Sequence, residues 1–446
     1  MAANASNIDV NAARQAANNF VKSKMASKSM FNAPATADLK LAHTEASSVE
    51  GNAYYVFNIQ GGGWVIIAGD DRAKQVLAYG DKGNIDMNDL PGSMKDYLQL
   101  YKNQIEEMQS YKGKVIAKKS IQRSTVIEPM LKSTWGQDEP MDRMCPMVSG
   151  EHAAVGCGPL AMAQIIYYWK YPTEHPGLDQ YYIYGLGTIP ALPATTFDYN
   201  LMLDSYTNYN PTTGGVSLGT YTDEQANEVA KLCRYCGQAC KVRYNSSSGS
   251  YTYDQRDAFK VMGFTNTDVK LIGIDPSYYC DNRNKYSKDE WIALIYSELE
   301  AGRPIPYHNV DFIDGHAWVL DGVDADGKFH MNWGWYERYN GWFEFGAFTV
   351  YPNGETWNFN GSGNEMVVNV YPYEGYVIPG DEPTSMRGDV NKDGAVNIAD
   401  VTALIDYLLS QDATGIDIDA ANCNQDEGVN IADVTKLIDY LLSQTW

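Results

Sequence analysis

The stretch GEHAAVGCGPLAMAQII (residues 150–166) places a glycine-flanked cysteine at the start of a long apolar run. The run indicates a buried helix that begins near Cys157. A cysteine beside an apolar segment is most often an ordinary core residue. At a helix N-terminus, however, the positive end of the helix dipole lowers the pKa of a thiol. Cys157 is therefore a candidate nucleophile if the chain also supplies a base.

The composition excludes several classes of function. The chain has 446 residues, 44% of them hydrophobic, and a formal net charge of −22. This length fits about three domains, and the hydrophobic content is sufficient for packed cores. The acidic charge repels polyanions, so we expect no nucleic-acid partner. No apolar stretch approaches the roughly 20 residues of a membrane helix, so we expect no membrane insertion.

The seven cysteines do not form a disulfide framework, because their number is odd and their spacing is irregular. Cys233, Cys236 and Cys240 have helical spacing, and no further Cys/His cluster completes a four-ligand zinc site. We expect these three to pack inside a helix.

Changes in composition and in hydrophobic pattern along the chain divide it into five segments. The first combines helical patterns with strand-like pieces, and the basic stretch YKGKVIAKKSIQRS that follows is typical of an exposed, protease-sensitive linker. A region rich in Trp, Tyr and Gly comes next, with one clear helix before several short strands. A Pro/Gly/acid-rich segment then leads to a duplicated helical region. The expected boundaries are 1–111, 112–124, 125–374, 375–386 and 387–446.

The last segment contains two similar loops, each followed by a similar helix. VNIADVTALIDYLLSQ (396–411) recurs as VNIADVTKLIDYLLSQ (429–444). The loop DVNKDGAVNIAD (389–400) has oxygen-bearing side chains at positions 1, 3, 5, 9 and 12 of an EF-hand-type loop, with Gly394 at the sharp turn. The following helix places Ile398, Val401, Leu404, Ile405 and Leu408 on one face. We predict calcium ligands at Asp389, Asn391, Asp393, Asn397 and Asp400, and at the carbonyl of Ala395.

The second loop, NCNQDEGVNIAD (422–433), departs from the pattern at two positions. Asn422 replaces the aspartate of position 1, and Glu427 stands where glycine is preferred, so we expect a weaker or distorted second calcium site. A merely solvated acidic face is the alternative. The predicted ligands are Asn422, Asn424, Asp426, the Gly428 carbonyl, Asn430 and Asp433. The paired motif resembles the type I dockerin family over 387–446, which implies docking onto a cohesin-type protein through the helices.

A candidate base lies far downstream of Cys157. GRPIPYHNVDFIDGHAWVLDGV (302–323) places His316 at the start of an apolar strand, and FHMNWGW (329–335) forms the next strand. Adjacent strands would bring Asn332 beside His316 to orient it, and would let Trp333 shield the pair from water. His330 shares the face of Asn332 by strand alternation, so Asn332 is not the sole polar candidate.

An acyl-transfer site also needs donors for the oxyanion. STWGQDEP (133–140) supplies Gln137, whose amide would act together with the backbone N–H of Cys157. Gly156 and Gly158 would leave room for a substrate backbone.

The order WGQ, GCG, GHA and NWGW resembles the streptopain family of secreted bacterial cysteine peptidases, which have a papain-like fold. The similarity covers roughly residues 50–372 and is most specific in HAAVGC (152–157), GHAWVLDG (315–322) and HMNWGW (330–335). The residues before the linker resemble the family's inhibitory prodomain, which implies a zymogen cut near Lys118–Ser124. The resemblance implies Cys157 as nucleophile, His316 as base, Asn332 as its orienting group, Trp333 as shield and Gln137 in the oxyanion hole.

The expected fold is α+β: a papain-like cysteine peptidase domain with an α+β prodomain, followed by a small all-α calcium-binding dockerin. We expect a self-processing cysteine endopeptidase zymogen that acts on proteins or peptides, with no cofactor for catalysis. A secreted or cell-surface location follows from the resemblance, although the N-terminus shows no signal-peptide pattern. Two alternatives stay open: an amidase or transglutaminase with the same Cys, His and Asn, and a non-catalytic calcium-dependent adhesion or scaffold subunit.

Overall fold

The computed structural model divides into two compact units, Met1–Tyr376 and Val377–Trp446. The expected cleavage region Lys118–Ser124, much of the second linker and Glu427 lie outside the described residues. Those described are 7–26, 38–111, 126–265, 268–309, 315–346, 363–379, 386–426, 428–443 and 445–446.

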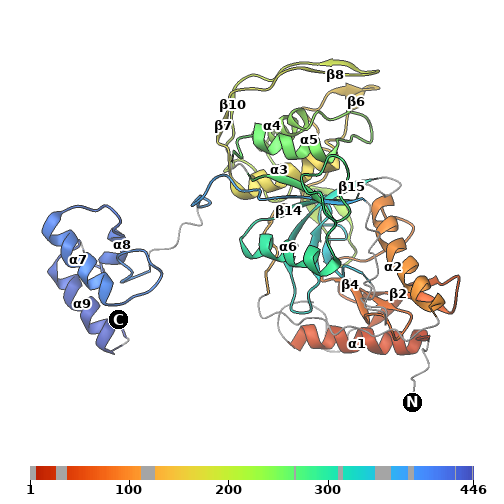
Figure 1. The fold of residues 1–446 in the computed structure, drawn as a ribbon, viewed down its shortest axis with the longest axis horizontal. Coiled ribbons are helices and arrows are strands. Elements are labelled where there is room, and N and C mark those ends of the chain that lie inside the picture. The colour runs from red at the N-terminus through yellow and green to blue at the C-terminus, as the bar shows by residue number, and fades with distance from the viewer. Residues whose placement is uncertain are drawn as a thin grey trace. The chain divides into compact units, whose positions relative to one another are not determined.

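A ten-stranded sheet organises the first unit (Figure 1). Its order is β1-β2-β3-β4-β17-β16-β15-β14-β18-β13, and every neighbouring pair is antiparallel. The strands are β1 (Leu39–Ala46), β2 (Asn52–Ile59), β3 (Trp64–Ala68), β4 (Val76–Gly80), β13 (Lys270–Gly273), β14 (Ile305–Asn309), β15 (His316–Val323), β16 (Phe329–Asn332), β17 (Gly341–Phe343) and β18 (Asn364–Val368).

The sheet continues across the expected boundary between prodomain and peptidase. β4 pairs with β17, with Tyr79 opposite Trp342 and Ala78 opposite Phe343. A Cβ at Gly341 would lie 2.5 Å from the Tyr79 carbonyl oxygen, so β17 needs glycine here to approach β4. Strands from before and after the linker therefore form one hydrogen-bonded layer.

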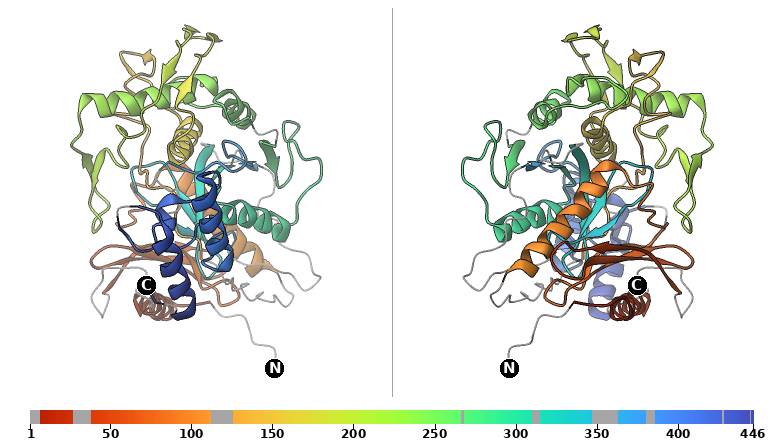
Figure 2. Two further views of the ribbon diagram at one scale, coloured as in Figure 1. Left: turned by 90° about the vertical axis from the view of Figure 1, so that its left-hand side faces the viewer. Right: turned by 90° about the vertical axis from the view of Figure 1, so that its right-hand side faces the viewer.

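Helices cover both faces of this sheet. α1 (Val10–Ala26) packs Ala13, Ala17 and Val21 into a core with Tyr79 and Trp342. α2 (Gly92–Ser110) and α6 (Lys288–Glu300) contribute to the core of the opposite face, and Figure 2 shows α2, in orange, lying across the strands.

α3 (Cys157–Trp169) lies on the same face of the sheet as α1. Gln164 of α3 contacts Asn332 of β16. By strand alternation Asn332 faces the same way as His330, which is paired with Trp342. Trp342 belongs to the core that α1 covers. α4 (Asp223–Ala239) and α5 (Thr252–Val261) pack against α3 (Figure 1). Two short strands precede α3, β5 (Met147–Val148) and β6 (Glu151–His152). Six more lie between α3 and α4: β7 (Glu174–His175), β8 (Tyr181–Ile183), β9 (Gly187–Ile189), β10 (Thr195–Thr196), β11 (Thr207–Tyr209) and β12 (Val216–Leu218).

The glycines around Cys157 have structural reasons of their own. Gly156 caps α3 with φ of 93°, a conformation that favours glycine. A Cβ at Gly158 would lie 3.0 Å from Ser250 Oγ, so glycine also admits the neighbouring loop. The sequence suggested only that these glycines leave room for substrate.

The cysteines of α4 behave as the helical spacing indicates. Cys233 and Cys236 lie within the helix and Cys240 directly follows it, and all three are buried free thiols. A capping box formed by Thr222 and Gln225 fixes the start of this helix.

The second unit contains α7 (Ile398–Ser410), α8 (Ile418–Ala421) and α9 (Ile431–Ser443). Its core includes Val401 and Leu404, whereas Ile398 and Ile405 of the same predicted apolar face are exposed. The helical pattern therefore indicated a wider buried face than the small core provides. In the part of the chain that the structure describes, no helix is both long and apolar enough to cross a membrane.

The junction between β4 and β17 gives a testable expectation for Gly341→Ala. The added Cβ meets backbone, which cannot move aside without breaking the strand pairing, so the free energy of unfolding of the full chain should fall by about 1–3 kcal/mol. Denaturant unfolding followed by tryptophan fluorescence measures this change.

Gly249→Ala is the control, because a Cβ there meets nothing within 4 Å. A Gly341→Ala chain as stable as the parent would show that the junction does not need the glycine. The same would follow if the substitution lowered the free energy of unfolding equally in chains with and without the first hundred residues.

Candidate active site

Cys157 is the first residue of α3 and is partly buried. Burial raises the pKa of its thiol, while hydrogen bonds from the backbone N–H groups of Ala317, Gly158 and Cys157 itself oppose that rise. Ala317 belongs to β15, so the helix N-terminus and the strand of the candidate base meet at the sulfur atom.

His316 begins β15, but its side chain is turned away from α3. Strand alternation places His316 with Trp318 on the face covered by α2 and α6. Its Nε2 bonds to the carbonyl oxygen of Trp333 at 3.0 Å, and its ring lies nearly parallel to Trp335 at 4.8 Å. Burial lowers the pKa of His316 to about 4, and the bond to Trp333 opposes this.

The thiol and the imidazole are therefore close along the backbone but not paired. Both residues are described, and no hydrogen bond joins their side chains. Because the pKa of Cys157 is raised and that of His316 is lowered, both groups are uncharged at neutral pH. A thiolate–imidazolium pair requires the His316 side chain to reach the α3 side of the sheet.

Asn332 does not contact His316 in this conformation. Its Nδ2 donates to the carbonyl oxygen of Ser133 at 2.9 Å and approaches Gln164 Oε1 at 3.4 Å. Its Oδ1 accepts from the Gly334 N–H at 3.2 Å. Asn332 thus occupies the α3 face, opposite to the face on which His316 now lies.

Of the other two predicted site residues, Gln137 lies close to Cys157 and Trp333 lies close to His316. Gln137 accepts a hydrogen bond from Val155 N at 3.0 Å through its backbone carbonyl, which places it beside the nucleophile loop. The Trp333 ring lies 6.1 Å from the His316 ring, and its carbonyl holds the imidazole. His330, the other polar candidate, pairs with Asp321 at 2.6 Å.

The sequence did not reveal the aromatic residues that enclose His316. Trp318 and Trp335 stack on the imidazole, and the GHAW and NWGW motifs could have drawn attention to them. Tyr97 of α2 packs edge-on against Trp318 and Trp333, with ring centroids 6.4 and 5.6 Å apart. Nothing in the helical pattern of α2 distinguishes Tyr97 from an ordinary core residue.

The sequence also did not indicate two further buried polar residues near Cys157. Gln255 of α5 donates from Nε2 to the Gly158 carbonyl oxygen at 2.6 Å. Its Oε1 is hydrogen-bonded to Nε2 of His308 on β14. GRPIPYHNV contains His308, but the sequence offered no partner for it.

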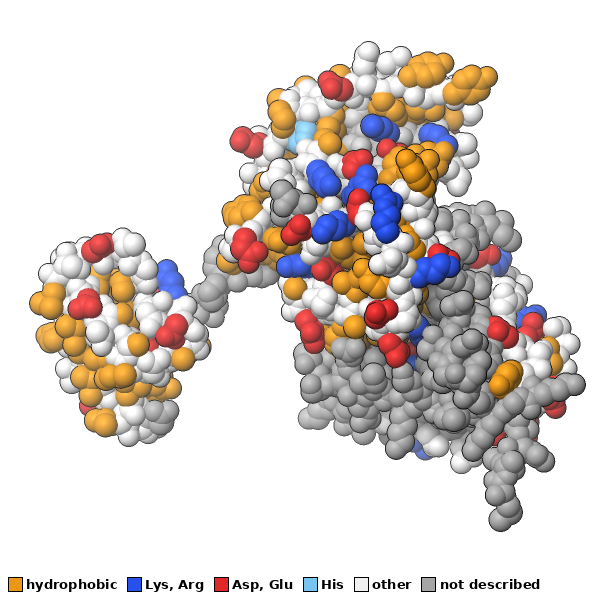
Figure 3. All heavy atoms as spheres, viewed as in Figure 1, with side chains coloured by type: hydrophobic (Ala, Val, Ile, Leu, Met, Phe, Trp, Pro, Cys, Tyr) orange, Lys and Arg blue, Asp and Glu red, His pale blue; other side chains and the backbone are white. Residues whose placement is uncertain are grey.

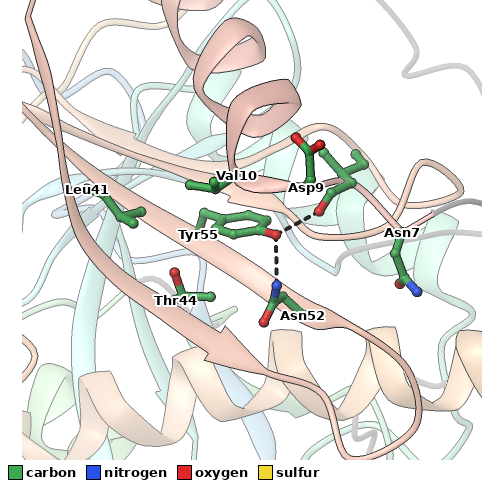
Figure 4. Close-up of a pocket in the computed structure, with 8 residues that line it drawn as sticks. Asn7, Asp9, Val10, Leu41, Thr44, Asn52 and Tyr55 are labelled. Carbon is green, nitrogen blue, oxygen red and sulfur yellow. Dashed lines mark hydrogen bonds between the residues drawn. The ribbon is translucent and has the colours of Figure 1, made fainter.

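A pocket of about 390 Å³ at the beginning of the chain is not the active site. In Figure 4 the Tyr55 hydroxyl donates to the Ile8 carbonyl oxygen and accepts from Asn52 Nδ2, at 2.7 and 2.8 Å. None of the candidate catalytic residues lines this pocket. Its lining is Asn7, Ile8, Asp9, Val10, Leu41, Thr44, Asn52 and Tyr55.

The first predicted calcium loop brings carboxylates together. Asp389, Asp393 and Asp400 each place one oxygen within 4.8 Å of the others. Asp400 is fully buried, and Gly394 has φ of 84° at the sharp turn. Like charges at this spacing repel unless a cation lies between them, so the donor set fits a hard divalent ion. Asn391, Asn397 and the Ala395 carbonyl belong to the same loop.

The second loop repeats the backbone arrangement of the first. Asp433 accepts from the N–H groups of Asn424 and Asn430 at 3.0 and 2.8 Å, as Asp400 does from those of Asn391 and Asn397. Asn422 Oδ1 accepts from Asp426 N at 3.2 Å, and Gly428 N donates to Asp426 Oδ1 at 3.1 Å. The described residues therefore show a formed loop with fewer charged ligands than the first.

Comparisons with known proteins match three regions of the chain to known families. Residues 135–343 match the Peptidase C10 family, residues 5–105 match the Spi protease inhibitor family, and residues 387–442 match the dockerin type I domain.

The chain is also similar to individual proteases. Streptopain of Streptococcus pyogenes is 26% identical over 390 residues, which cover 81% of this chain and 91% of that protein. The thiol protease/hemagglutinin PrtT of Porphyromonas gingivalis is 26% identical over 348 residues, which cover 74% of this chain and 38% of that protein.

Among solved structures, a fragment of prointerpain A from Prevotella intermedia superimposes with a TM-score of 0.57. It is 25% identical, and the match covers 75% of this chain and 99% of that one. The chain is therefore a streptopain-like cysteine endopeptidase, in which a papain-like Peptidase C10 domain follows an inhibitor-like prodomain and precedes a dockerin type I domain.

Proposed function

We propose that this chain is a latent, secreted endopeptidase in which Cys157 is the nucleophile and His316 the base. The observation that carries the proposal is the packing of α3, which begins at Cys157, against β15, which begins at His316; the Ala317 N–H of β15 opposes the rise in the pKa of the thiol. A modest movement at the beginning of β15 would bring the imidazole from the opposite face to the thiol. Proteins or peptides are the substrates, and no cofactor is needed.

The proposed reaction proceeds through a thioester. The Cys157 thiolate attacks the scissile carbonyl carbon, and the Gln137 side-chain amide and the Cys157 N–H bind the oxyanion. His316 protonates the amine as the C–N bond breaks, which leaves the thioester on Cys157. His316 then takes a proton from the attacking water, the C–S bond breaks, and the carboxylic product leaves while the Cys157 thiolate is regenerated. Asn332 already lies on the α3 face, where it would orient His316, and Trp333 would exclude water from the pair.

The prodomain supports the inactive position of His316. Tyr97 of α2 presses edge-on against Trp318 and Trp333, which lie beside the imidazole. We infer that loss of the prodomain uncovers this aromatic cluster and releases His316 toward α3. Cleavage in the 112–124 linker, near Lys118–Ser124, would start this process.

Charged contacts hold the prodomain in place next to β16 and β17. Asp324 is buried and bonded to Lys24 and the Tyr79 hydroxyl at 3.2 and 2.7 Å. Breaking these contacts leaves Asp324 Oδ2 without its two partners, which is costly, whereas Oδ1 keeps its bonds from the N–H groups of Asp326 and Lys328. Further prodomain–peptidase ion pairs are Lys74–Glu344, Lys82–Glu337 and Asp89–Arg338.

The second unit would attach the enzyme to a cohesin-type protein. Dockerin type I domains generally bind calcium, and we propose that Asp389, Asn391, Asp393, the Ala395 carbonyl, Asn397 and Asp400 hold one ion. The second ion would be held by Asn422, Asn424, Asp426, the Gly428 carbonyl, Asn430 and Asp433. Calcium would relieve the repulsion between these carboxylates and thereby stabilise the fold.

Exposed apolar side chains on α7 and α9 suit such docking. Ile398 and Leu409 are 70% and 81% exposed, and their counterparts Ile431 and Leu442 are 70% and 82% exposed. Hydrophobic side chains gather on the surface of this unit in Figure 3. Large exposed apolar residues at matching positions of a repeat indicate a surface for a protein partner.

Cys157→Ala tests the proposed nucleophile. The variant has no thiol to form the thioester, so casein hydrolysis should fall by roughly 10⁴-fold or more. Mass spectrometry of the incubated full-length chain should then show no cut within 112–124.

The matched control is Cys145→Ala, which removes a buried free thiol elsewhere in the same domain and should leave processing intact. A Cys157→Ala chain that processes itself or cleaves casein would refute the mechanism. Amine transfer in place of hydrolysis would identify a transglutaminase instead.

Tyr97→Ala tests how the prodomain maintains latency. Removing this buried ring should weaken packing by about 3–5 kcal/mol, and the linker should be cut faster because His316 is held less firmly. The measurement is the first-order rate of linker cleavage by gel electrophoresis.

Tyr97→Phe is the control, because it keeps the ring edges on Trp318 and Trp333 and loses only the hydroxyl. Equal cleavage rates for Tyr97→Ala and Tyr97→Phe would show that the ring does not maintain latency.

The second unit should depend on calcium for both stability and docking. At a calcium concentration of about 1,000 times the dissociation constant, binding should add about 4 kcal/mol to the free energy of unfolding. Calorimetry of residues 387–446 with calcium and with excess chelator measures this difference, which Asp400→Asn should reduce.

Replacement of Leu409 and Leu442 by serine should abolish retention on an immobilised type I cohesin while calcium-dependent melting is preserved. Identical melting with calcium and chelator would refute the metal sites, and full retention of the double variant would refute this docking face.

A further inference from the structure

A series of buried, hydrogen-bonded polar residues connects the first turn of α3 to the strands of the sheet. Gln255 is 0% exposed, and its Nε2 donates to the Gly158 carbonyl oxygen at 2.6 Å. The amide oxygen is therefore left to face His308. Because a carbonyl oxygen only accepts, the Nε2 atom of His308 must carry the proton of this bond.

His308 lies directly beside the strand of the candidate base. It stands opposite Ala317 of β15, whose N–H contacts the Cys157 thiol. Burial, followed by the charge of nearby His316, lowers the pKa of His308 to about 3, so its hydrogen-bond pattern stays that of a neutral imidazole. His308 thus lies next to Ala317 through strand pairing and reaches Gly158 through Gln255.

Glu365 fixes the helix that carries Gln255. It stands opposite His308 on β18, and its carboxylate accepts from Ser277 Oγ at 2.9 Å and from the hydroxyl of Thr252. Thr252 is the first residue of α5, so the carboxylate anchors the helix one turn before Gln255. A buried network of this kind is rigid when all its members are paired, and its loss leaves polar atoms unpartnered.

We propose that Gln255 and His308 are positioning residues for the peptidase reaction. They fix Gly158 of α3 relative to Ala317 of β15, and the backbone N–H groups of these two residues bond to the Cys157 thiol. Neither residue touches the substrate. This inference rests on the proposed role of Cys157, and a displacement of about 1 Å at such a site lowers the rate by roughly 100-fold.

The experiment compares processed enzymes made from the full-length chain. In Gln255→Leu and His308→Leu, kcat per titrated active site should fall by roughly 10- to 100-fold, while KM stays within about twofold. Alkylation of Cys157 by iodoacetamide should slow in parallel. His308→Gln offers an amide N–H to Gln255, so it should recover kcat to within about fivefold of the parent, even if His308→Leu folds poorly.

Gln238→Leu is the matched control. Gln238 is also a buried glutamine that donates to two carbonyl oxygens, those of Asp179 and Pro190, at 2.6 and 3.1 Å. It lies on α4, and among the described residues its side chain bonds to Arg234, Asp179 and Pro190 and to none of those around Cys157, so kcat should stay near that of the parent.

Three results would overturn the inference: parental kcat in His308→Leu, no recovery in His308→Gln, or a loss in Gln238→Leu as large as that in Gln255→Leu. If the parent enzyme cleaved no peptide and the Cys157→Ala variant behaved in the same way, the proposed function would be overturned instead.

Discussion

The pairing of β4 with β17 is the interaction on which the first unit depends. It makes the inhibitor-like prodomain and the peptidase domain one antiparallel sheet, with Tyr79 opposite Trp342. Once the strands are joined, α2 has a single face on which to bury its apolar side, and that face carries Trp318 and Trp333. The prodomain therefore contacts the surroundings of His316 through the hydrophobic core. In the described residues, this core is where α2 packs.

Burial sets the charge of both reacting groups in this conformation. Desolvation disfavours the charged form of any titratable group, so it raises the pKa of Cys157 and lowers that of His316. An ion pair would reverse both changes, but the two side chains lie on opposite faces of the sheet. Local geometry is therefore sufficient to keep the thiol protonated. The hydrogen bond from Gln255 to Gly158 holds the first turn of α3 in position in this conformation.

The second unit follows a different physical rule. Its core is small, and much of its organisation comes from two loops whose backbone N–H groups converge on Asp400 and Asp433. Buried carboxylates that accept several backbone hydrogen bonds are well placed to hold a cation. The small core also explains why α7 and α9 leave leucine and isoleucine side chains in solvent, where a partner can cover them.

The sequence by itself determined the helix that begins at Cys157, the strands around His316 and Asn332, and the two similar loops that precede α7 and α9. These features depend on local periodicity and short spacing, which a linear pattern records. The tertiary structure alone decided that the prodomain and peptidase share one sheet, that Asn332 bonds to Ser133 and Gln164, and that His316 faces Tyr97's side of the sheet. Strand pairing between distant segments and the choice of sheet face arise from packing across the whole unit, and no local pattern in the chain encodes them.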